Sequence, residues 1–299
     1  MAEGARLVHV GNVVADLVMY VPALPETGGD VLASDSRLTA GGAFNAMVSA
    51  CRQGLPAVYG GMHGTGPFAD LCRARLAAAG IELAQSRFPD LDSGFTVALV
   101  DPSGERTFAT SPGAEARLDA AALAALDIRP ADLVAVSGYG LAYPSNGPAL
   151  ADWMSTVDAT VIVDPGPLVA DIPEPILRAA LDRADWWTCN EREARVLTER
   201  LDTAGRVGTL IRSGKRGCVV ALRGRPPVTV AAFEVTAVDT NGAGDTHLGA
   251  FAAALADGLD PIDAVVRANA AAAIAVTRFG PATAPNRTEV DELVASRPR

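Results

Sequence analysis

Short apolar runs alternate with helix-patterned stretches from residue 132 onward, and this rhythm limits the fold more than any other feature of the sequence. The apolar runs are expected to be buried strands, and the stretches between them amphipathic helices. Strands that alternate with helices imply parallel βαβ units, with helices on both faces of one sheet. The sequence therefore predicts an α/β fold. The expected strands are 133–137, 160–163, 186–189, 209–211 and 217–222, and the expected helices are 148–157, 176–183, 191–201 and 260–276.

The first part of the chain departs from this rhythm in two stretches of mixed polarity, about residues 12–40 and 93–112. The second contains two strand-like runs around Asp101-Pro-Ser-Gly104, a pattern typical of a β-hairpin. No repeat, low-complexity tract or linker divides the sequence. We therefore expect one domain, residues 1–299, in which these two stretches form a small β appendage. The other elements expected here are strands at 7–10 and 57–61 and a helix at 67–79.

Three small residues, Gly242-Ala243-Gly244, separate a β-favouring run at 227–235 from a helix-patterned stretch that contains Leu248 and Phe251. This order predicts a strand, a tight turn and a helix. The first N–H groups of a helix have no partner within it and lie at the positive end of the helix dipole, so they bind anions. Because glycine has no Cβ, an anion can approach the backbone closely at this turn.

Asp245 is the unusual member of this turn, because a carboxylate beside an anion site repels phosphate unless it serves to accept a proton. A proton acceptor at an anion site indicates phosphoryl transfer to a hydroxyl group. The alternative is that Asp245 only favours the start of the helix, as acids in the first turn commonly do. Taken alone, the residue supports the two interpretations equally.

Two further groups of residues have both a functional and a purely structural interpretation. Asn190 and Glu193 lie on one helical face, where the carboxylate could hold Mg2+ through water, but their spacing also fits a capping box, the favoured interpretation without other evidence. Asp16 precedes a second glycine-opened helix and could bind substrate hydroxyls, or simply occupy a turn. Gly41 and Gly42 allow either close approach of a ligand or a sharp turn.

Two other phosphate-binding patterns fit less well. Ser213-Gly-Lys-Arg216 lacks the hydroxyl residue and the first glycine of a P-loop, which excludes that motif. Gly64-Thr-Gly-Pro-Phe-Ala69 matches a relaxed dinucleotide fingerprint, with Asp90 and Asp92 downstream, and keeps an NAD-dependent dehydrogenase as a distant alternative. His247 is expected to pack or to hydrogen-bond locally, since an acid in the same turn already suits the base role.

The charge and the cysteine pattern narrow the classes of partner. A formal net charge of −10 argues against nucleic acids and anionic membrane surfaces, which are recognised mainly through positive charge. Four dispersed cysteines and three histidines predict neither a zinc site nor a disulfide framework. The start resembles no signal peptide, and no apolar run reaches the roughly 18 residues of a membrane span. We therefore expect a cytoplasmic protein that binds neither nucleic acid nor membrane.

Four motifs, in this order along the chain, resemble those of the ribokinase-like sugar and nucleoside kinases, the PfkB family. Gly41-Gly-Ala-Phe-Asn45 resembles the N-terminal glycine signature of that family, and Asn190-Glu-Arg-Glu193 its N-x-x-E motif. Gly214-Lys-Arg-Gly217 resembles its G-x-x-G nucleotide loop, and Asp239-Thr-Asn-Gly-Ala-Gly-Asp245 its D-T-x-G-A-G-D signature. The tail, 269–280, is similar to that of ribokinases. Together these matches cover essentially the whole chain.

The resemblance implies a three-layer α/β/α, Rossmann-like domain with a mostly parallel sheet, in which residues 12–40 and 93–112 form a β lid. It also implies transfer of the γ-phosphoryl group of ATP, with Mg2+, to a hydroxymethyl group of a sugar. By motif position, Asp245 would be the catalytic base, and the anion hole would consist of Gly242, Ala243 and Gly244. The sugar would be bound by Asp16, Gly41, Gly42 and Asn45. The nucleotide would be bound by Asn190, Gly214, Gly217 and Asn269. Glu193 would hold Mg2+ through water, and Asp239, Asn241, Ala275, Arg278 and Gly280 occupy the positions of a monovalent-cation site, expected to take K+.

The sequence departs from the family pattern at three places. Arg212 stands where the nucleotide loop usually has threonine, residues 138–143 contain no acid, and Gly166 replaces a common asparagine, so the acceptor need not be ribose. A nucleoside kinase, or a catalytically weak sugar-binding or regulatory protein, are the alternatives. Arg106 is a candidate to reach the phosphates or the substrate, although most such arginines are solvated. A lid that offers a sheet edge also implies a homodimer.

Overall fold

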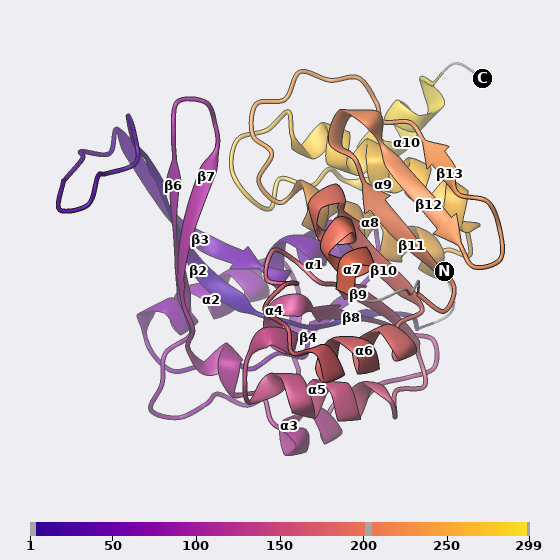
Figure 1. The fold of residues 1–299 in the computed structure, drawn as a ribbon, viewed down its shortest axis with the longest axis horizontal. Coiled ribbons are helices and arrows are strands. Elements are labelled where there is room, and N and C mark those ends of the chain that lie inside the picture. The colour runs from indigo at the N-terminus through magenta and orange to yellow at the C-terminus, as the bar shows by residue number, and fades with distance from the viewer. Residues whose placement is uncertain (1–3, 201–204, 298–299) are drawn as a thin grey trace.

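The computed structural model describes residues 4–200 and 205–297, and a large twisted sheet lies at its centre (Figure 1). Within these residues, nine strands form this sheet in the order β13-β12-β11-β10-β9-β8-β1-β4-β5. The strands from β11 to β5 are parallel to one another. At the other edge, β12 pairs antiparallel with both β11 and β13. The strands are β1 Leu7–Val10, β4 Ala57–Tyr59, β5 Glu82–Leu83, β8 Leu133–Ser137, β9 Thr160–Asp164, β10 Trp186–Asn190, β11 Gly208–Arg212, β12 Cys218–Leu222 and β13 Val228–Val230.

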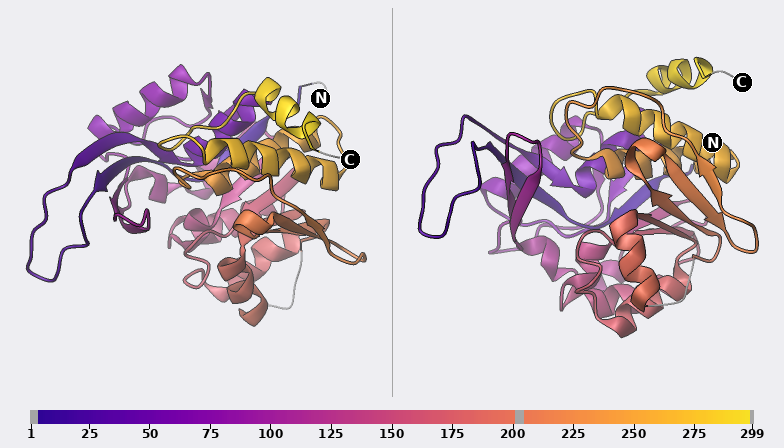
Figure 2. Two further views of the ribbon diagram at one scale, coloured as in Figure 1. Left: turned by 90° about the horizontal axis from the view of Figure 1, so that it is seen from above. Right: turned by 45° about the horizontal axis from the view of Figure 1, so that its top comes forward.

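Helices cover both faces of the sheet, because alternate side chains of its strands enter two separate hydrophobic cores (Figure 2). Leu7 of β1 packs in the first core and its neighbour Val8 in the second. The predicted three-layer α/β/α architecture with a mostly parallel sheet is thereby confirmed. The first face carries α1 Ala43–Arg52, α2 Pro67–Ala78, α8 Ala243–Ala256, α9 Pro261–Ala275 and α10 Arg287–Ala295. The second carries α3 Ala120–Ala124, α4 Gly138–Ala142, α5 Asn146–Met154, α6 Glu174–Arg183 and α7 Glu191–Arg200.

The carboxyl ends of the parallel strands form the edge at which chemistry is expected. The chain extends the sheet from β1 in both directions, with β4 on one side and β8 on the other, which makes this point the topological switch of the sheet. Ligands of open α/β sheets bind at such a crevice. The last residues of β8, β9, β10 and β11 are Ser137, Asp164, Asn190 and Arg212. These four residues therefore face the crevice from adjacent strands.

A second, smaller sheet projects from the body, at the left of Figure 1. Its order is β3-β2-β6-β7, with β2 and β6 parallel and the other pairs antiparallel. The predicted hairpin is confirmed as β6 and β7. Since the strands come from both mixed-polarity stretches, these do form a β appendage, while its description as a lid on one domain stays a prediction. Its strands are β2 Val13–Tyr20, β3 Asp35–Gly42, β6 Phe95–Val100 and β7 Arg106–Ser111.

The structure differs from the predicted elements mainly near the chain's last third. The run 227–235 is a strand only at 228–230, and residues 231–241 carry neither helix nor strand before α8 begins. β13 is an edge strand paired over three residues with β12 alone, so nothing in the sheet extends it. The predicted helix 191–201 reaches Arg200, and Leu201 lies outside the described residues. Within the described chain, no helix has the length and apolar character that a membrane span needs.

Candidate active site

The amino end of α8 provides backbone donors for an anion. Gly242 has a left-handed conformation (φ 71°, ψ 9°) that turns the chain into the helix. The Ala243 N–H donates to the Thr240 carbonyl oxygen (3.3 Å), whereas the N–H groups of Gly242 and Gly244 donate to no atom of the described chain. A Cβ on residue 244 would lie 3.4 Å from the guanidinium carbon of Arg212. The predicted anion hole therefore offers backbone donors beside a cationic side chain.

Asp245, in the first turn of α8, lies against the start of α1. The two helices pack closely because residue 249 is glycine: a Cβ there would lie 2.2 Å from the carbonyl oxygen of Ala46. At their amino ends, Asn45 Nδ2 donates to Asp245 Oδ2 (3.1 Å). Two predicted site residues that are 200 positions apart are thus in direct contact.

Asp16 lies on β2 next to the glycine pair at the end of β3. A Cβ on Gly41 would lie 1.8 Å from Asp16 Oδ2, so the absence of a side chain there creates the space that the carboxylate occupies. Gly42 serves the backbone instead: its φ is 65°, and a Cβ would lie 2.3 Å from the Asn12 carbonyl oxygen. Gly41 therefore positions a side chain, and Gly42 makes the turn into α1.

Asp245 is close enough to Asp16 to influence the protonation of the Asp16 carboxylate. Burial, and after it the negative charge of Asp245, raises the pKa of Asp16 from 3.8 to about 7. Burial likewise raises the pKa of Asp245 from 3.8 to about 6, while the hydrogen bond from Asn45 and the charge of Arg212 lower it and the charge of Asp164 raises it. Perturbed acids that share a cleft are candidates for proton transfer.

Arg212, at the end of β11, is the main site residue that sequence reasoning left without a role. Its Nη1 donates to Asp164 Oδ2 (2.9 Å) and to Thr188 Oγ1 (2.6 Å), and its Nη2 lies 3.7 Å from Glu193 Oε2. Burial opposes the charged guanidinium, but the two carboxylates outweigh it and raise the pKa of Arg212. The side chain is thus a permanent cation directly behind Gly244. Its place at the end of a strand was the available signal.

Asn190 and Glu193 form the predicted capping box. Glu193 N–H donates to Asn190 Oδ1 (2.9 Å), and Asn190 donates to both Glu193 oxygens, from its backbone N–H (2.8 Å) and from Nδ2 (2.8 Å). Each carboxylate oxygen keeps a further lone pair, which suits contact with Mg2+ through water rather than direct ligation. In the described chain, no group of three or more His, Cys, Asp or Glu side chains is arranged to hold a metal ion.

The predicted nucleotide residues Gly217 and Asn269 meet at the end of β13. A Cβ on Gly217, whose φ is 95°, would lie 2.1 Å from the Val230 carbonyl oxygen. Asn269 Nδ2 donates to that same oxygen (3.0 Å). Gly214 lies across the 3₁₀ turn Gly214–Arg216, with φ 55° and open space around its Cα. The structure therefore groups the three positions around the turn between β11 and β12 and the strand next to it.

Asp239 uses both of its carboxylate oxygens within the chain. Oδ1 accepts hydrogen bonds from the Asn241 N–H (2.8 Å) and from Arg106 Nη2, and Oδ2 accepts from the Gly280 N–H (3.0 Å). Arg106 Nη1 also donates to Thr240 Oγ1 (3.3 Å). Both side chains of this ion pair are largely buried, with exposed fractions of 14% and 6%.

Two other positions of the predicted cation site, Ala275 and Arg278, also have partners within the chain. The Ala275 carbonyl oxygen accepts from the Arg278 N–H (3.1 Å) and from Thr283 Oγ1 (3.2 Å). The Arg278 side chain pairs with Glu289 and donates to the Thr283 carbonyl oxygen (3.1 Å). The carboxylate and this carbonyl are therefore already satisfied, and a guanidinium group is paired with the one carboxylate among the predicted cation ligands.

Two other residues gain an interpretation from their surroundings. Tyr139, in α4, is half-buried, and burial, followed by the charges of Asp16 and Asp245, raises its pKa. No sequence motif pointed to it. His247 is buried within α8, and burial lowers its pKa to about 3, which leaves it neutral and agrees with a packing role.

The dinucleotide interpretation of Gly64–Ala69 is wrong. The amino end of α2, where a pyrophosphate would bind, already accepts a carboxylate: Asp92 Oδ2 and Oδ1 take hydrogen bonds from the N–H groups of Phe68 (3.1 Å) and Ala69 (2.8 Å). A Cβ on Gly66 would also lie 2.5 Å from the Asp92 carboxyl carbon. Asp92 thus closes this helix end instead of binding a ribose.

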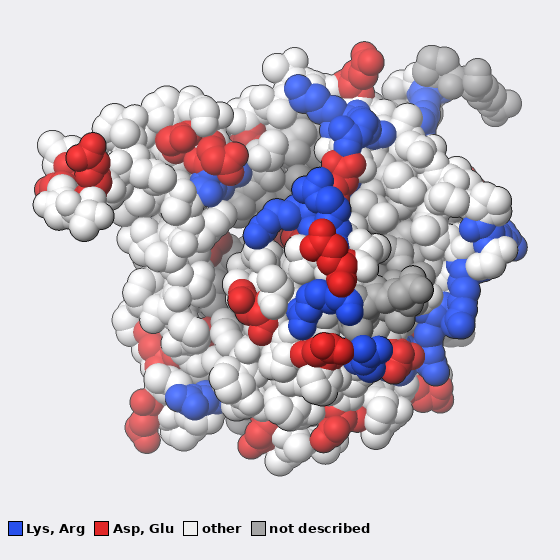
Figure 3. Space-filling view, in the orientation of Figure 1, with Lys and Arg blue, Asp and Glu red and all other residues white. Residues whose placement is uncertain are grey.

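Positive charge on the face that carries the crevice is local, as an anion site on an acidic protein requires. Figure 3 shows Lys and Arg side chains gathered with acids in a column over the middle of the body, around α7, and further basic side chains at the right-hand edge. The surface is hollowed beside this column, toward the second sheet.

Comparisons with known proteins agree with this geometry. The model of the pfkB family of carbohydrate kinases matches residues 5–289. An uncharacterised sugar kinase, YegV, of Escherichia coli strain K12 is 33% identical over 94% of this chain and 91% of its own length. The ribokinase of Bacillus subtilis strain 168 is 30% identical over 96% of this chain and 98% of its own. Among solved structures, the ribokinase of Thermotoga maritima superposes with a TM-score of 0.78 at 25% identity, covering 97% of this chain and 99% of that one. The chain therefore belongs to the pfkB family of carbohydrate kinases and is an ATP-dependent kinase of that family.

Proposed function

We propose that this protein transfers the γ-phosphoryl group of ATP to a hydroxymethyl group of a sugar or a sugar-containing small molecule, with Asp245 as general base. One observation carries the proposal: Asp245 lies at a helix end with free backbone N–H donors, in hydrogen-bond contact with Asn45 and within electrostatic reach of Asp16. An acid held beside an anion site, and facing a second acid that can bind hydroxyls, has the parts that phosphoryl transfer to an alcohol needs.

Asp245 would accept the proton of the attacking hydroxyl. Its pKa of about 6 makes it ionised at neutral pH, yet more basic than an ordinary aspartate. The hydrogen bond from Asn45 fixes the orientation of one carboxylate oxygen and leaves the other for the acceptor. The raised pKa reflects burial, which also strengthens every charge interaction in the site.

Asp16 would orient the acceptor by accepting hydrogen bonds from two of its hydroxyl groups. Its carboxylate lies over Gly41, so the acceptor would lie between β2 and the start of α1. Gly42 and Asn45 border the same place, and Tyr139, from α4, is a further candidate to contact the acceptor.

The N–H groups of Gly242 and Gly244, with Ala243 between them, would stabilise the charge that develops on the transferring phosphoryl group. Arg212 adds a fixed cation behind Gly244. Gly214, Gly217 and Asn269 would shape the nucleotide site. Asn190 and Glu193 would hold Mg2+ through water, and Mg2+, when bound, neutralises phosphate charge. The outcome is a site that positions two reactants and balances charge between them.

The sheet β3-β2-β6-β7 would act as a lid that keeps water from competing as acceptor. Its edge strands β3 and β7 lie open, and Leu32 (86% exposed) and Phe108 (55% exposed) are apolar residues on its surface. Such an edge favours pairing with a second copy, so the proposal includes a homodimer through the lid. Light scattering after gel filtration tests this, and a monomer at working concentration would exclude it.

The experiment that tests the proposed reaction is an ADP-release screen with Mg-ATP over pentoses, hexoses, sugar phosphates and nucleosides. Release that depends on a sugar supports the proposal, and release that depends on a nucleoside identifies a nucleoside kinase with the same machinery. Binding of a sugar without ADP release would instead identify a catalytically weak sugar-binding protein. The variant Asp245→Asn is the control for every positive acceptor.

A further inference from the structure

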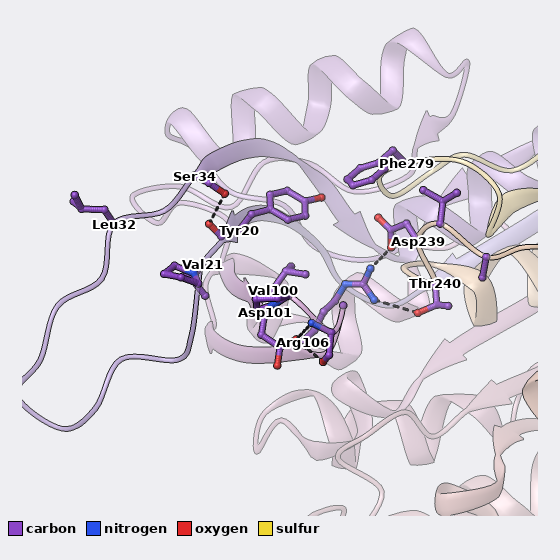
Figure 4. A pocket seen from close by; sticks show the side chains of 16 residues that line it. Tyr20, Val21, Leu32, Ser34, Val100, Asp101, Arg106, Asp239, Thr240 and Phe279 are labelled. Atoms are coloured by element: carbon purple, nitrogen blue, oxygen red, sulfur yellow. Dashed lines mark hydrogen bonds and ion pairs between the residues drawn. The ribbon is translucent and has the colours of Figure 1, made fainter.

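The ion pair between Arg106 and Asp239 joins the lid to the loop that leads into the anion hole. Arg106 is the first residue of β7, and its partner lies 133 positions away, directly before Thr240 and the turn into α8 (Figure 4). The two residues border a pocket of about 750 Å3 between the lid and residues 237–240. This pocket contains none of the proposed catalytic residues, so the ion pair lies beside the reaction centre and not in it.

Asp239 holds three segments together. Its carboxylate binds the lid through Arg106, the anion-hole loop through the Asn241 N–H, and the loop after α9 through the Gly280 N–H. Its own N–H donates to the Val276 carbonyl oxygen (3.1 Å). The charge of a carboxylate that is only 6% exposed must be compensated, and Arg106 supplies the compensating charge.

The one carboxylate at the family's monovalent-cation positions already has a positive partner in this chain. Asp239 carries a buried guanidinium partner and two N–H donors, and the Ala275 carbonyl oxygen already accepts two hydrogen bonds. A cation that binds the Asp239 carboxylate would compete with Arg106, whose Nη2 and Nη1 contact Asp239 and Thr240. The positive charge is thus part of the chain.

We propose that the guanidinium group of Arg106 replaces the monovalent cation in this protein, so that the position of the anion-hole loop is independent of K+. The expected effects on the rate of ADP release rest on the proposed phosphoryl transfer, whereas the expected effects on the unfolding midpoint do not. Arg106 is a positioning residue: it acts on the N–H groups of Gly242 and Gly244 through Asp239. Because Arg106 belongs to the lid, its ion pair with Asp239 also holds the lid against the anion-hole loop.

The test compares four proteins in potassium chloride and in tetramethylammonium chloride at equal ionic strength. They are the wild type, Arg106→Met, Arg106→Lys and the matched control Arg129→Met, which removes an exposed arginine whose partner is Asp127. Two quantities are measured for each: the rate of ADP release with the acceptor found in the screen, and the thermal unfolding midpoint of the ligand-free protein.

The wild type, Arg106→Lys and Arg129→Met should give the same rate and the same midpoint in both salts. Arg106→Met should lose about 10²-fold in rate in tetramethylammonium, as expected when one preorganised group is removed. Potassium should restore part of that rate and raise the midpoint of this variant, because the vacated space beside Asp239 then accepts a cation.

Two results would overturn the proposal. One is activation or stabilisation of the wild type by potassium, and the other is an Arg106→Met variant that behaves identically in both salts by both measures. If that variant does not fold, the wild type and Arg106→Lys still decide, since a potassium response of either contradicts a built-in cation. If no acceptor yields ADP, the proposed function fails, while the unfolding midpoints still test Arg106.

Discussion

Replacing Asp245 by asparagine should abolish most turnover and at the same time make the protein more stable. The substitution keeps the size of the side chain and an oxygen that can accept the hydrogen bond from Asn45 Nδ2. Loss of a general base lowers turnover by about 10²–10⁴-fold. Nucleotide binding should persist, because the N–H groups of Gly242 and Gly244 belong to the backbone.

The gain in stability follows from the pKa of Asp245, which the fold raises from 3.8 to about 6. A raised pKa means that the folded protein holds the proton more tightly than the unfolded chain. Ionisation of this carboxylate therefore lowers the free energy of unfolding. The loss is absent below the unfolded pKa, grows as pH rises to about 6 and is constant above it. A shift of about two units corresponds to about 3 kcal/mol, the upper limit of the expected gain for Asp245→Asn at neutral pH and above.

Urea denaturation of the wild type and Asp245→Asn between about pH 4 and about pH 8 measures this difference. Tryptophan fluorescence reports the transition, since Trp186 and Trp187 are buried on β10. The control is Asp70→Asn, which removes another first-turn acid, on α2, that is 72% exposed and paired with Arg73. It should change stability by no more than about 0.5 kcal/mol. Near-normal turnover, or an Asp245→Asn variant less stable than the wild type at about pH 8, would refute the reasoning.

Three further predictions concern the surroundings of Asp245. Gly41→Ala should keep the fold but lose about 10²-fold in kcat/KM, because its Cβ would displace the Asp16 carboxylate. Gly42→Ala should instead lower the unfolding midpoint, because its Cβ meets the Asn12 backbone carbonyl. Kinetics and thermal unfolding of both variants check this. The pH profile of kcat/KM should rise with the ionisation of the Asp16–Asp245 pair, whose pKa values are raised to about 7 and about 6, and reach a plateau at higher pH; a profile that is flat through this range would contradict the assignment. Arg212→Met should move that rise to higher pH, because the charge of Arg212 lowers the pKa of Asp245, and an unshifted profile would exclude this coupling.

The parallel core could be predicted from the sequence because each buried strand is a short apolar run. β8 was expected at 133–137 and lies at Leu133–Ser137, where two helical layers bury every residue but the last. The antiparallel edge of the sheet was harder to predict from the sequence. Residues 231–235 include the strand-favouring Phe233 and Val235, but within the described chain β13 has no neighbour on its outer side. A strand needs a partner that local propensity does not reveal.

Three helices, α3, α4 and α10, escaped prediction, and the last two did so for opposite reasons. α4 contains two glycines and has low helix propensity, yet Ser137 caps it by accepting a hydrogen bond from the Tyr139 N–H (3.3 Å). α10 carried a readable signal, the capping box of Asn286 and Glu289, which went unused. Low helix propensity hides α4 in the sequence, whereas the capping box is a sequence signal for α10.

The charge balance of the site lies beyond sequence reasoning, because its ion pairs join distant positions. Arg212 meets Asp164 from 48 residues away, and Arg106 meets Asp239 from 133 residues away. Motif position indicated only that the first arginine replaces a usual threonine, and the second was a candidate to reach the phosphates or the substrate, with a solvated position as the alternative. The structure instead places them on two sides of the amino end of α8, each paired with an acid.

This arrangement explains how a chain with a net charge of −10 can offer a site to a polyphosphate. The crevice holds several acids, among them Asp16, Asp164 and Asp245, and each would repel phosphate if it were uncompensated. Neutral backbone donors alone cannot balance them. Because the two arginines are committed to acids beside the anion hole, they offset that repulsion and keep the N–H groups in position, without forming an open basic patch that would attract other polyanions. Asp164 pairs with Arg212, whereas no ion pair of the described residues includes Asp16 or Asp245. Asp245 receives only the hydrogen bond from Asn45, and a carboxylate without a cationic partner in contact can act as a base.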